Sequence, residues 1–137
     1  MNNIEIQNKA IYSPLQIFFG SLFFGPLSML YFLWKNFDIM KEPVKAKKVP
    51  YYGSIFIIIL ITCLKLTPPE INQLVPGIVV PFLYALVALQ ISTSLQMNKE
   101  AIIANPNYTL QPLQKVIAYG AILYLPWLAI SFYMQNL

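Results

Sequence analysis

Two carboxylates lie four residues apart in the most polar stretch of this chain, at Asp38 and Glu42. Positions i and i+4 share one face of a helix, and paired carboxylates serve general acid–base chemistry or metal binding. Lys35 and Lys41 lie among them, however. This mixture of charges favours a solvated surface, so we expect neither a catalytic residue nor a metal site here.

The side chains on which enzymes commonly rely are scarce in the rest of the chain. It contains no histidine and a single cysteine, Cys63, within an apolar run. None of the five acidic residues falls inside a long apolar run, where a proton-coupled transporter generally needs an ionisable group. Glycine-rich phosphate loops and nucleophile–base pairs are absent from the sequence. It therefore predicts a protein that is not an enzyme and needs no cofactor.

Three further lysines, Lys45, Lys47 and Lys48, form a basic group. A lysine at a membrane surface gains about 1 kcal/mol from anionic lipid, so these three are candidate contacts for anionic lipid. The alternative is that they only set the orientation of the chain. All nine basic residues are lysines. The lack of arginine, which makes bidentate contacts to bases and phosphates, argues against a nucleic-acid partner.

Composition points to a protein that is solvated by lipid. The 137 residues are 58% hydrophobic and only 10% charged, whereas a soluble domain is about 25% charged. So few charges cannot cover the surface of a soluble globule. We therefore predict a single all-α domain over residues 1–137 that lies in the lipid bilayer.

Long uncharged runs predict an integral membrane bundle of four transmembrane helices, several of them kinked at proline. Pro26 is expected to kink the first helix, although Gly25 and Pro26 could instead turn it back as a re-entrant segment. Pro43 and Pro50 argue against a continuous helix through residues 35–48. The predicted spans are about 12–34, 50–67, 75–96 and 113–133.

Lysine distribution predicts the orientation of these spans. Four crossings place loops 35–48 and 98–112 on the same side, with seven of the nine lysines. Lysine and arginine are enriched in cytoplasmic loops, so the lysine-rich loop 35–48 is expected in the cytoplasm and both termini outside.

Polar residues gather at the end of the third predicted span. Gln90 and Ser94 are four residues apart and share a helix face. They are candidates to line a polar path inside the bundle. The alternative is that the helix has simply reached the headgroup region.

A short sequence occurs twice: residues 48–53 and 115–120 both read Lys-Val-x-x-Tyr-Gly. It indicates either a repeat of two-helix hairpins or the shared needs of two helices that enter a membrane from the same side.

The first apolar run contains Tyr12-Ser13-Pro14-Leu15-Gln16, then Gly25-Pro26-Leu27, and is followed by Asn36-Phe37. This order resembles the opening of a family of small, uncharacterised bacterial membrane proteins with four spans. It extends loosely through Pro76-Gly77 and Tyr84, and Phe24 stands where members often have a small residue. The resemblance implies a location in the bacterial inner membrane and implies no activity.

These observations favour a protein that works by binding a membrane partner or itself, including an accessory or immunity-like role. The alternative is a subunit of an oligomeric channel or transporter, lined by the polar end of the third helix. An enzyme acting on lipid is the least favoured class, because candidate catalytic groups are lacking.

Overall fold

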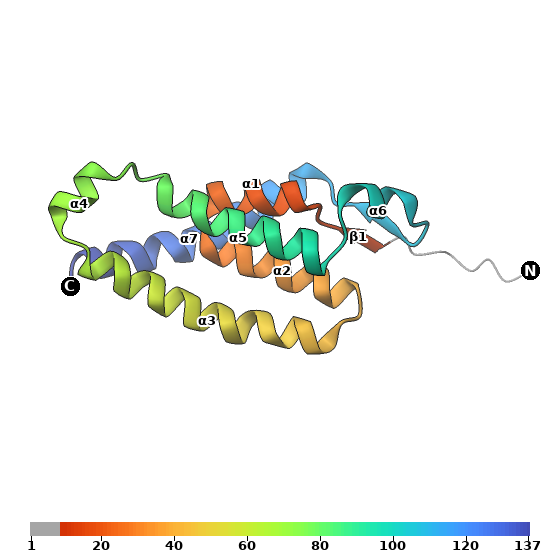
Figure 1. The fold of residues 1–137 in the computed structure, drawn as a ribbon, viewed down its shortest axis with the longest axis horizontal. Helices are drawn as coiled ribbons and strands as arrows, with labels where there is room; N and C mark the ends of the chain where they lie inside the picture. Colours follow the sequence, from red (N-terminus) through yellow and green to blue (C-terminus); the bar gives the residue numbers. More distant parts are fainter. Residues whose placement is uncertain (1–8) are drawn as a thin grey trace, which may run out of the picture.

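The computed structural model describes residues 9–137. Within that range the chain forms seven helices and one pair of short strands, so the all-α prediction is confirmed (Figure 1). In order, the elements are β1 (Lys9–Ile11), α1 (Pro14–Phe24), α2 (Pro26–Ile39), α3 (Pro43–Leu66), α4 (Pro69–Leu74), α5 (Val79–Leu95), α6 (Lys99–Ala104), β2 (Tyr108–Leu110) and α7 (Leu113–Gln135).

Residues 12–34 do not form one membrane-spanning helix. The chain turns back at Gly25, and α2 runs antiparallel to α1 (Figure 1). Gly25 has a φ of 89° and a ψ of −178°, a conformation that essentially only glycine adopts, and Pro26 cannot continue the hydrogen bonding of α1. With 11 and 14 residues, the two helices are about 17 and 21 Å long. Each is too short for a hydrocarbon core of about 30 Å, so the single span was wrong and the turn-back alternative describes the fold.

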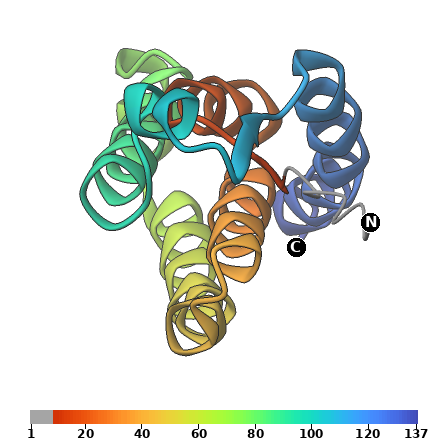
Figure 2. The same cartoon turned by 90° about the vertical axis from the view of Figure 1, so that its right-hand side faces the viewer.

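This α1–α2 hairpin lies at the centre of the molecule. Seen end-on in Figure 2, α5 and α7 lie on its two sides and α3 lies beside α2, while α1 forms part of the outer surface. Each of the three outer helices packs on the hairpin far more than on the other two. Most of the buried core belongs to the hairpin, and the outer helices add a few side chains. The core residues are Tyr12, Ile17, Met29, Phe32, Leu33, Tyr84, Ala88 and Val116.

Two glycines let outer helices approach the hairpin closely. A Cβ atom on Gly53 of α3 would come within 2.5 Å of the Leu30 side chain, and one on Gly120 of α7 would overlap the Phe24 ring. These glycines end the two Lys-Val-x-x-Tyr-Gly sequences, so the shared sequence has a shared packing role. The preceding elements differ, because the α1–α2 hairpin comes directly before α3, whereas α6 and β2 lie between α5 and α7.

A side-chain amide joins the two ends of the hairpin. Asn36 Nδ2 donates to the carbonyl oxygen of Tyr12 over 2.8 Å, and the Tyr12 amide donates to Asn36 Oδ1 over 2.9 Å. Asn36 Nδ2 also donates to Gln96 Oε1, and Gln96 Nε2 donates to the Leu33 carbonyl oxygen, both over 2.9 Å. We call this pair of side chains, Asn36 and Gln96, the amide clasp. Asn36 is only 1% exposed, and the clasp ties the end of α5 to the hairpin.

The segment before α7 is tied to the start of the hairpin in the same way. Ser13 caps α1 in a reciprocal capping box with Gln16. Gln16 Nε2 then donates to the carbonyl oxygen of Gln111 over 2.7 Å, and Gln111 Nε2 donates to that of Ala10 over 3.0 Å. β1 and β2 pair in parallel alongside, a pairing that the sequence did not reveal.

Four predicted segments need correction: the start of the second span, the loops 35–48 and 98–112, and the start of the third span. α3 begins at Pro43 and continues through Pro50, since a helix can tolerate an internal proline at the loss of one backbone hydrogen bond. Only residues 40–42 separate α2 from α3, and the predicted loop 98–112 contains α6 and β2. The third helix begins at Val79 rather than at residue 75. The fourth predicted helix is confirmed as α7.

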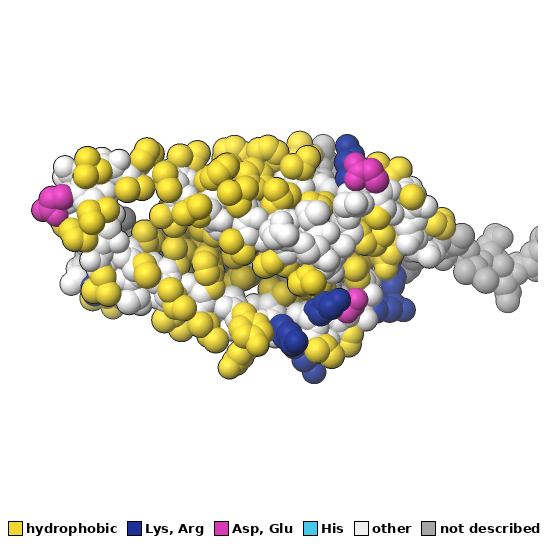
Figure 3. Space-filling view, in the orientation of Figure 1, with side chains coloured by type: hydrophobic (Ala, Val, Ile, Leu, Met, Phe, Trp, Pro, Cys, Tyr) yellow, Lys and Arg dark blue, Asp and Glu magenta, His cyan; other side chains and the backbone are white. Residues whose placement is uncertain are grey.

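Charge is concentrated at one end of the bundle, here called the lysine end. It holds β1, the α2–α3 turn, α6, β2 and the start of α7 (Figures 1 and 3). Eight of the nine lysines lie there, and the ninth, Lys65, lies at the opposite, α4 end. Lys9 is at the lysine end and the C-terminus at the α4 end (Figure 1). The expectation that both ends of the chain share one side stays a prediction, because residues 1–8 lie outside the described residues.

Within residues 9–137, two helices rather than four are long and apolar enough to cross a membrane, α3 and α7. α5 is also apolar but has 17 residues, and α1 has 11.

We expect Asn36→Ala to lower the free energy of unfolding by about 2 kcal/mol, because both backbone groups of Tyr12 would lose their buried partner. Thermal unfolding in mild detergent measures the effect. Asn72→Ala is the matched control, since Asn72 is exposed and makes one long hydrogen bond of 3.5 Å. Equal melting temperatures for the two variants would contradict the prediction that the amide clasp stabilises the fold.

Gly25→Ala should destabilise the protein by roughly 1–3 kcal/mol, the usual cost of forcing a residue into such a backbone conformation. The added Cβ would also lie 2.9 Å from the Trp127 ring. Gly77→Ala provides the comparison, because nothing lies within 4 Å of its Cβ position. The hairpin turn would be refuted if Gly25→Ala melted at the wild-type temperature.

Candidate functional site

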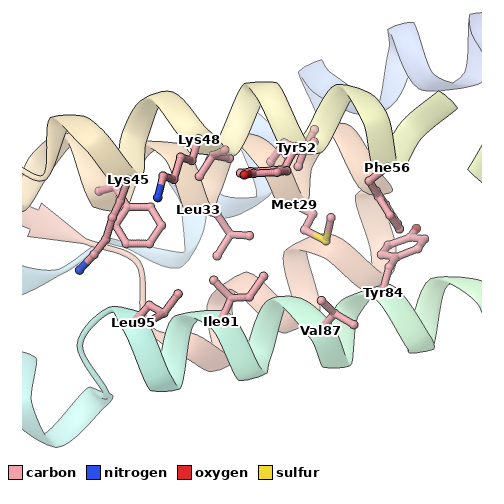
Figure 4. A pocket seen from close by; sticks show the side chains of 14 residues that line it. Met29, Leu33, Lys45, Lys48, Tyr52, Phe56, Tyr84, Val87, Ile91 and Leu95 are labelled. Atoms are coloured by element: carbon pink, nitrogen blue, oxygen red, sulfur yellow. The ribbon is translucent and has the colours of Figure 1, made fainter. Parts of the chain in front are cut away.

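A groove of about 350 Å³ lies between α2, α3 and α5. It exists because α3 and α5 both pack on the hairpin but hardly on each other. In Figure 4, α3 forms one wall and α5 the other, with Met29 and Leu33 of α2 between them.

The walls of the groove are almost wholly apolar. On each outer helix, side chains spaced three or four residues apart share the face that lines the groove. At one end, the rings of Phe56 and Tyr84 meet edge to face with centroids 6.3 Å apart. Besides the two lysines described next, the lining residues are Met29, Leu30, Leu33, Phe37, Val49, Tyr52, Gly53, Phe56, Tyr84, Val87, Ile91 and Leu95.

Two lysines stand at the other end of the groove, at the lysine end of the bundle. Lys45 Nζ forms an ion pair of 3.1 Å with Glu42 Oε2 and lies 5.9 Å from the centroid of the Phe37 ring. Lys48 makes no ion pair within residues 9–137. Its ammonium group points toward the groove, and the Tyr52 hydroxyl is directed to the same end (Figure 4).

The structure thus brings together two of the three lysines predicted to contact anionic lipid. Lys45 and Lys48 line the groove, three residues apart on α3. Lys47 is exposed on the same helix but does not line it. The three lysines of the sequence cluster are therefore not equivalent.

Gln90 and Ser94 do share a face of α5, as predicted. Gln90 Nε2 donates to Ser94 Oγ over 3.0 Å, and both residues are exposed. The side of α5 that packs on the hairpin carries Ala85, Ala88 and Ser92 instead. A polar path lined by Gln90 and Ser94 would therefore have to lie between copies of the chain.

The two carboxylates of the polar stretch do not form a paired site. Asp38 pairs with Lys35 at 3.6 Å and Glu42 pairs with Lys45. Both ion pairs are partly exposed, a situation in which each contributes little to stability. Across residues 9–137, histidine, cysteine and acidic side chains form no group of three able to hold a metal ion.

Tyr12 is the most deeply buried titratable group outside the groove, at 1% exposed. Burial raises the pKa of its phenol above the usual value, and the nearby Tyr31 and Tyr119 rings act in the same direction. The hydroxyl therefore stays protonated at neutral pH.

An apolar groove with ammonium groups at one end fits an amphiphilic ligand. A hydrocarbon chain would lie along the apolar walls of the groove, and an acidic headgroup would lie beside Lys45 and Lys48. The spacing of three or four residues between these side chains on α3 and on α5 is visible in the sequence. Whether the two faces form a groove depends on which helices are neighbours, and no sequence signal reveals that.

Comparisons with protein-family models, with curated proteins and with solved structures found no match for this chain.

Proposed function

We propose that this chain is a multi-pass membrane protein that binds an anionic phospholipid in the groove, without an enzymatic reaction. In this arrangement α3, α5 and α7 cross the bilayer, and the α1–α2 hairpin enters from the lysine end and returns to it. This topology replaces the four-span bundle.

The surface of the outer helices supports a membrane setting. Large apolar side chains point outward along all three, with exposed fractions such as 64% for Ile58, 57% for Leu83 and 66% for Leu125. A soluble protein rarely leaves so extensive an apolar surface uncovered. α5, with 17 residues, lies at the short limit for a span.

Charge supports the orientation. With the hairpin returning to its own side, the lysines divide eight to one instead of seven to two. The positive-inside rule then places the lysine end in the cytoplasm. Lys9 is accordingly cytoplasmic and the C-terminus lies on the outer side. The inner membrane of a bacterium, implied by the sequence resemblance, is consistent with this arrangement.

The groove carries the functional proposal, because its single cationic end coincides with the cytoplasmic surface. The cytoplasmic leaflet presents anionic headgroups at the level of Lys45 and Lys48. A lipid chain can reach the groove from the side, between α3 and α5, without carrying its headgroup through an apolar region, which would cost several kcal/mol. The proposed partner is thus a lipid molecule, in place of the membrane protein or second copy of the chain expected from the sequence.

The topology is tested with single cysteines in a Cys63→Ser background. Lys9→Cys should resist a membrane-impermeant maleimide applied to intact cells, and Asn136→Cys should react with it. Both should react after the membrane is permeabilised. Equal labelling of the two positions in intact cells would mean that they lie on the same side of the membrane. That result requires an even number of crossings and would refute the proposed topology.

Lipid selectivity tests the groove. Purified protein in neutral detergent should bind phosphatidylglycerol more tightly than phosphatidylcholine of the same chain length, as measured by native mass spectrometry. A double variant, Lys45→Gln with Lys48→Gln, should lose roughly tenfold to thirtyfold in affinity for phosphatidylglycerol, because each lysine contributes about 1 kcal/mol. Phosphatidylcholine binding should change little.

Two controls are available on the same helices. Lys47→Gln removes an equal charge outside the groove and should leave the preference intact. Ile91→Trp fills the groove and should weaken binding of both lipids, whereas Leu86→Trp, on the exposed side of α5, should not. Equal affinity of the wild-type protein for the two lipids would overturn the proposal.

A further inference from the structure

A second hollow lies at the α4 end of the bundle, beyond the tip of the hairpin. Two cavities of about 550 and 280 Å³ share the lining residues Leu64, Asn72, Trp127 and Ser131. They lie between α3, α4, α5 and α7, on the side of the molecule opposite to the lysine cluster. We call the two together the outer cavity.

The short hairpin explains why this space is hollow. α1 and α2 end at Gly25, where the Trp127 ring of α7 lies against the turn. Beyond this level no central helix separates α3, α5 and α7, while the outer helices continue toward the α4 end (Figure 1). Trp127 therefore marks the inner limit of the outer cavity.

The one charged side chain of the outer cavity lies in its larger part. There Lys65, Thr67 and Gln135 line the cavity together with apolar side chains such as Ile130 and Met134. The smaller part extends toward the middle of the bundle, where Leu60, Val80 and Tyr84 line it, and Asn72 and Ser131 line both parts. Tyr84 also lines the groove at the lysine end, so the two hollows approach each other on either side of one side chain.

We infer that the outer cavity binds a second phospholipid, one from the leaflet opposite to that of the groove. Its phosphate lies beside Lys65, the hydrogen-bonding side chains surround the headgroup, and one acyl chain extends toward Tyr84. This inference rests on the membrane topology proposed above. The bundle would then hold two lipids tail to tail, one in each leaflet.

Charge at the two sites sets different selectivities. The groove presents Lys45 and Lys48, with Lys47 nearby, against one paired acid, Glu42. The α4 end carries one lysine, Lys65, and one acidic residue, Glu70. The outer cavity should accordingly require a phosphate but discriminate little between phosphatidylglycerol and phosphatidylethanolamine.

Lipid stoichiometry tests the inference. The wild-type protein, released from vesicles of phosphatidylglycerol and phosphatidylethanolamine, should retain up to two lipids in native mass spectrometry. Ser131→Trp fills the outer cavity and should reduce the maximum to one, which is enriched in phosphatidylglycerol. Ile91→Trp fills the groove and should leave one lipid without that enrichment. Leu128→Trp, on the exposed side of α7, should retain both.

The headgroup requirement is tested with diacylglycerol, which has acyl chains but no phosphate. In the Ile91→Trp background, phosphatidylethanolamine should occupy the outer cavity at least tenfold more strongly than diacylglycerol, and Lys65→Gln should abolish that difference. The inference is overturned if diacylglycerol binds equally well, or if Ser131→Trp retains as many lipids as the wild-type protein. In both cases loss of a lipid in Ile91→Trp would still support the groove, whereas an unchanged count in Ile91→Trp would overturn the groove itself.

Discussion

The tight turn at Gly25 is the constraint on which the rest of this structure depends. It makes two short helices out of an apolar run long enough for a span, and Asn36 holds their far ends together through the backbone of Tyr12. Backbone groups that are buried without a partner cost free energy, most of all where water is excluded. The amide clasp satisfies these groups and also ties the hairpin to α5.

The shape of the hairpin accounts for both hollows. Because the hairpin occupies the centre only at the lysine end, α3 and α5 pack on it there and leave a groove between them. Past its tip the outer helices surround an unfilled space. The lysines of both hollows lie toward the ends of the bundle rather than its middle, an arrangement that fits the proposed membrane setting.

Several features followed from the sequence because they depend on local chemistry. The helical class and the bounds of α7 come from apolar runs and their flanking residues. The residues behind the family resemblance acquire a structural meaning here: Ser13 and Gln16 cap α1, Gly25 makes the turn, and Asn36 closes the hairpin. The course of α3 through Pro50 was missed, since the single hydrogen bond that a proline removes is weaker than the packing that holds the helix.

The sequence by itself determined that this chain is helical, strongly apolar in composition and basic in a few short stretches, since hydrophobicity and charge are properties of single residues and short runs. Only the tertiary structure decided that the first run folds back, that Lys9 and the C-terminus lie at opposite ends, and that Lys45 and Lys48 but not Lys47 face a groove. Each depends on contacts between residues distant in the chain: Asn36 with Tyr12, Gly25 with Trp127, and the spacing of α3 from α5. Such contacts leave no periodic signal in a single sequence.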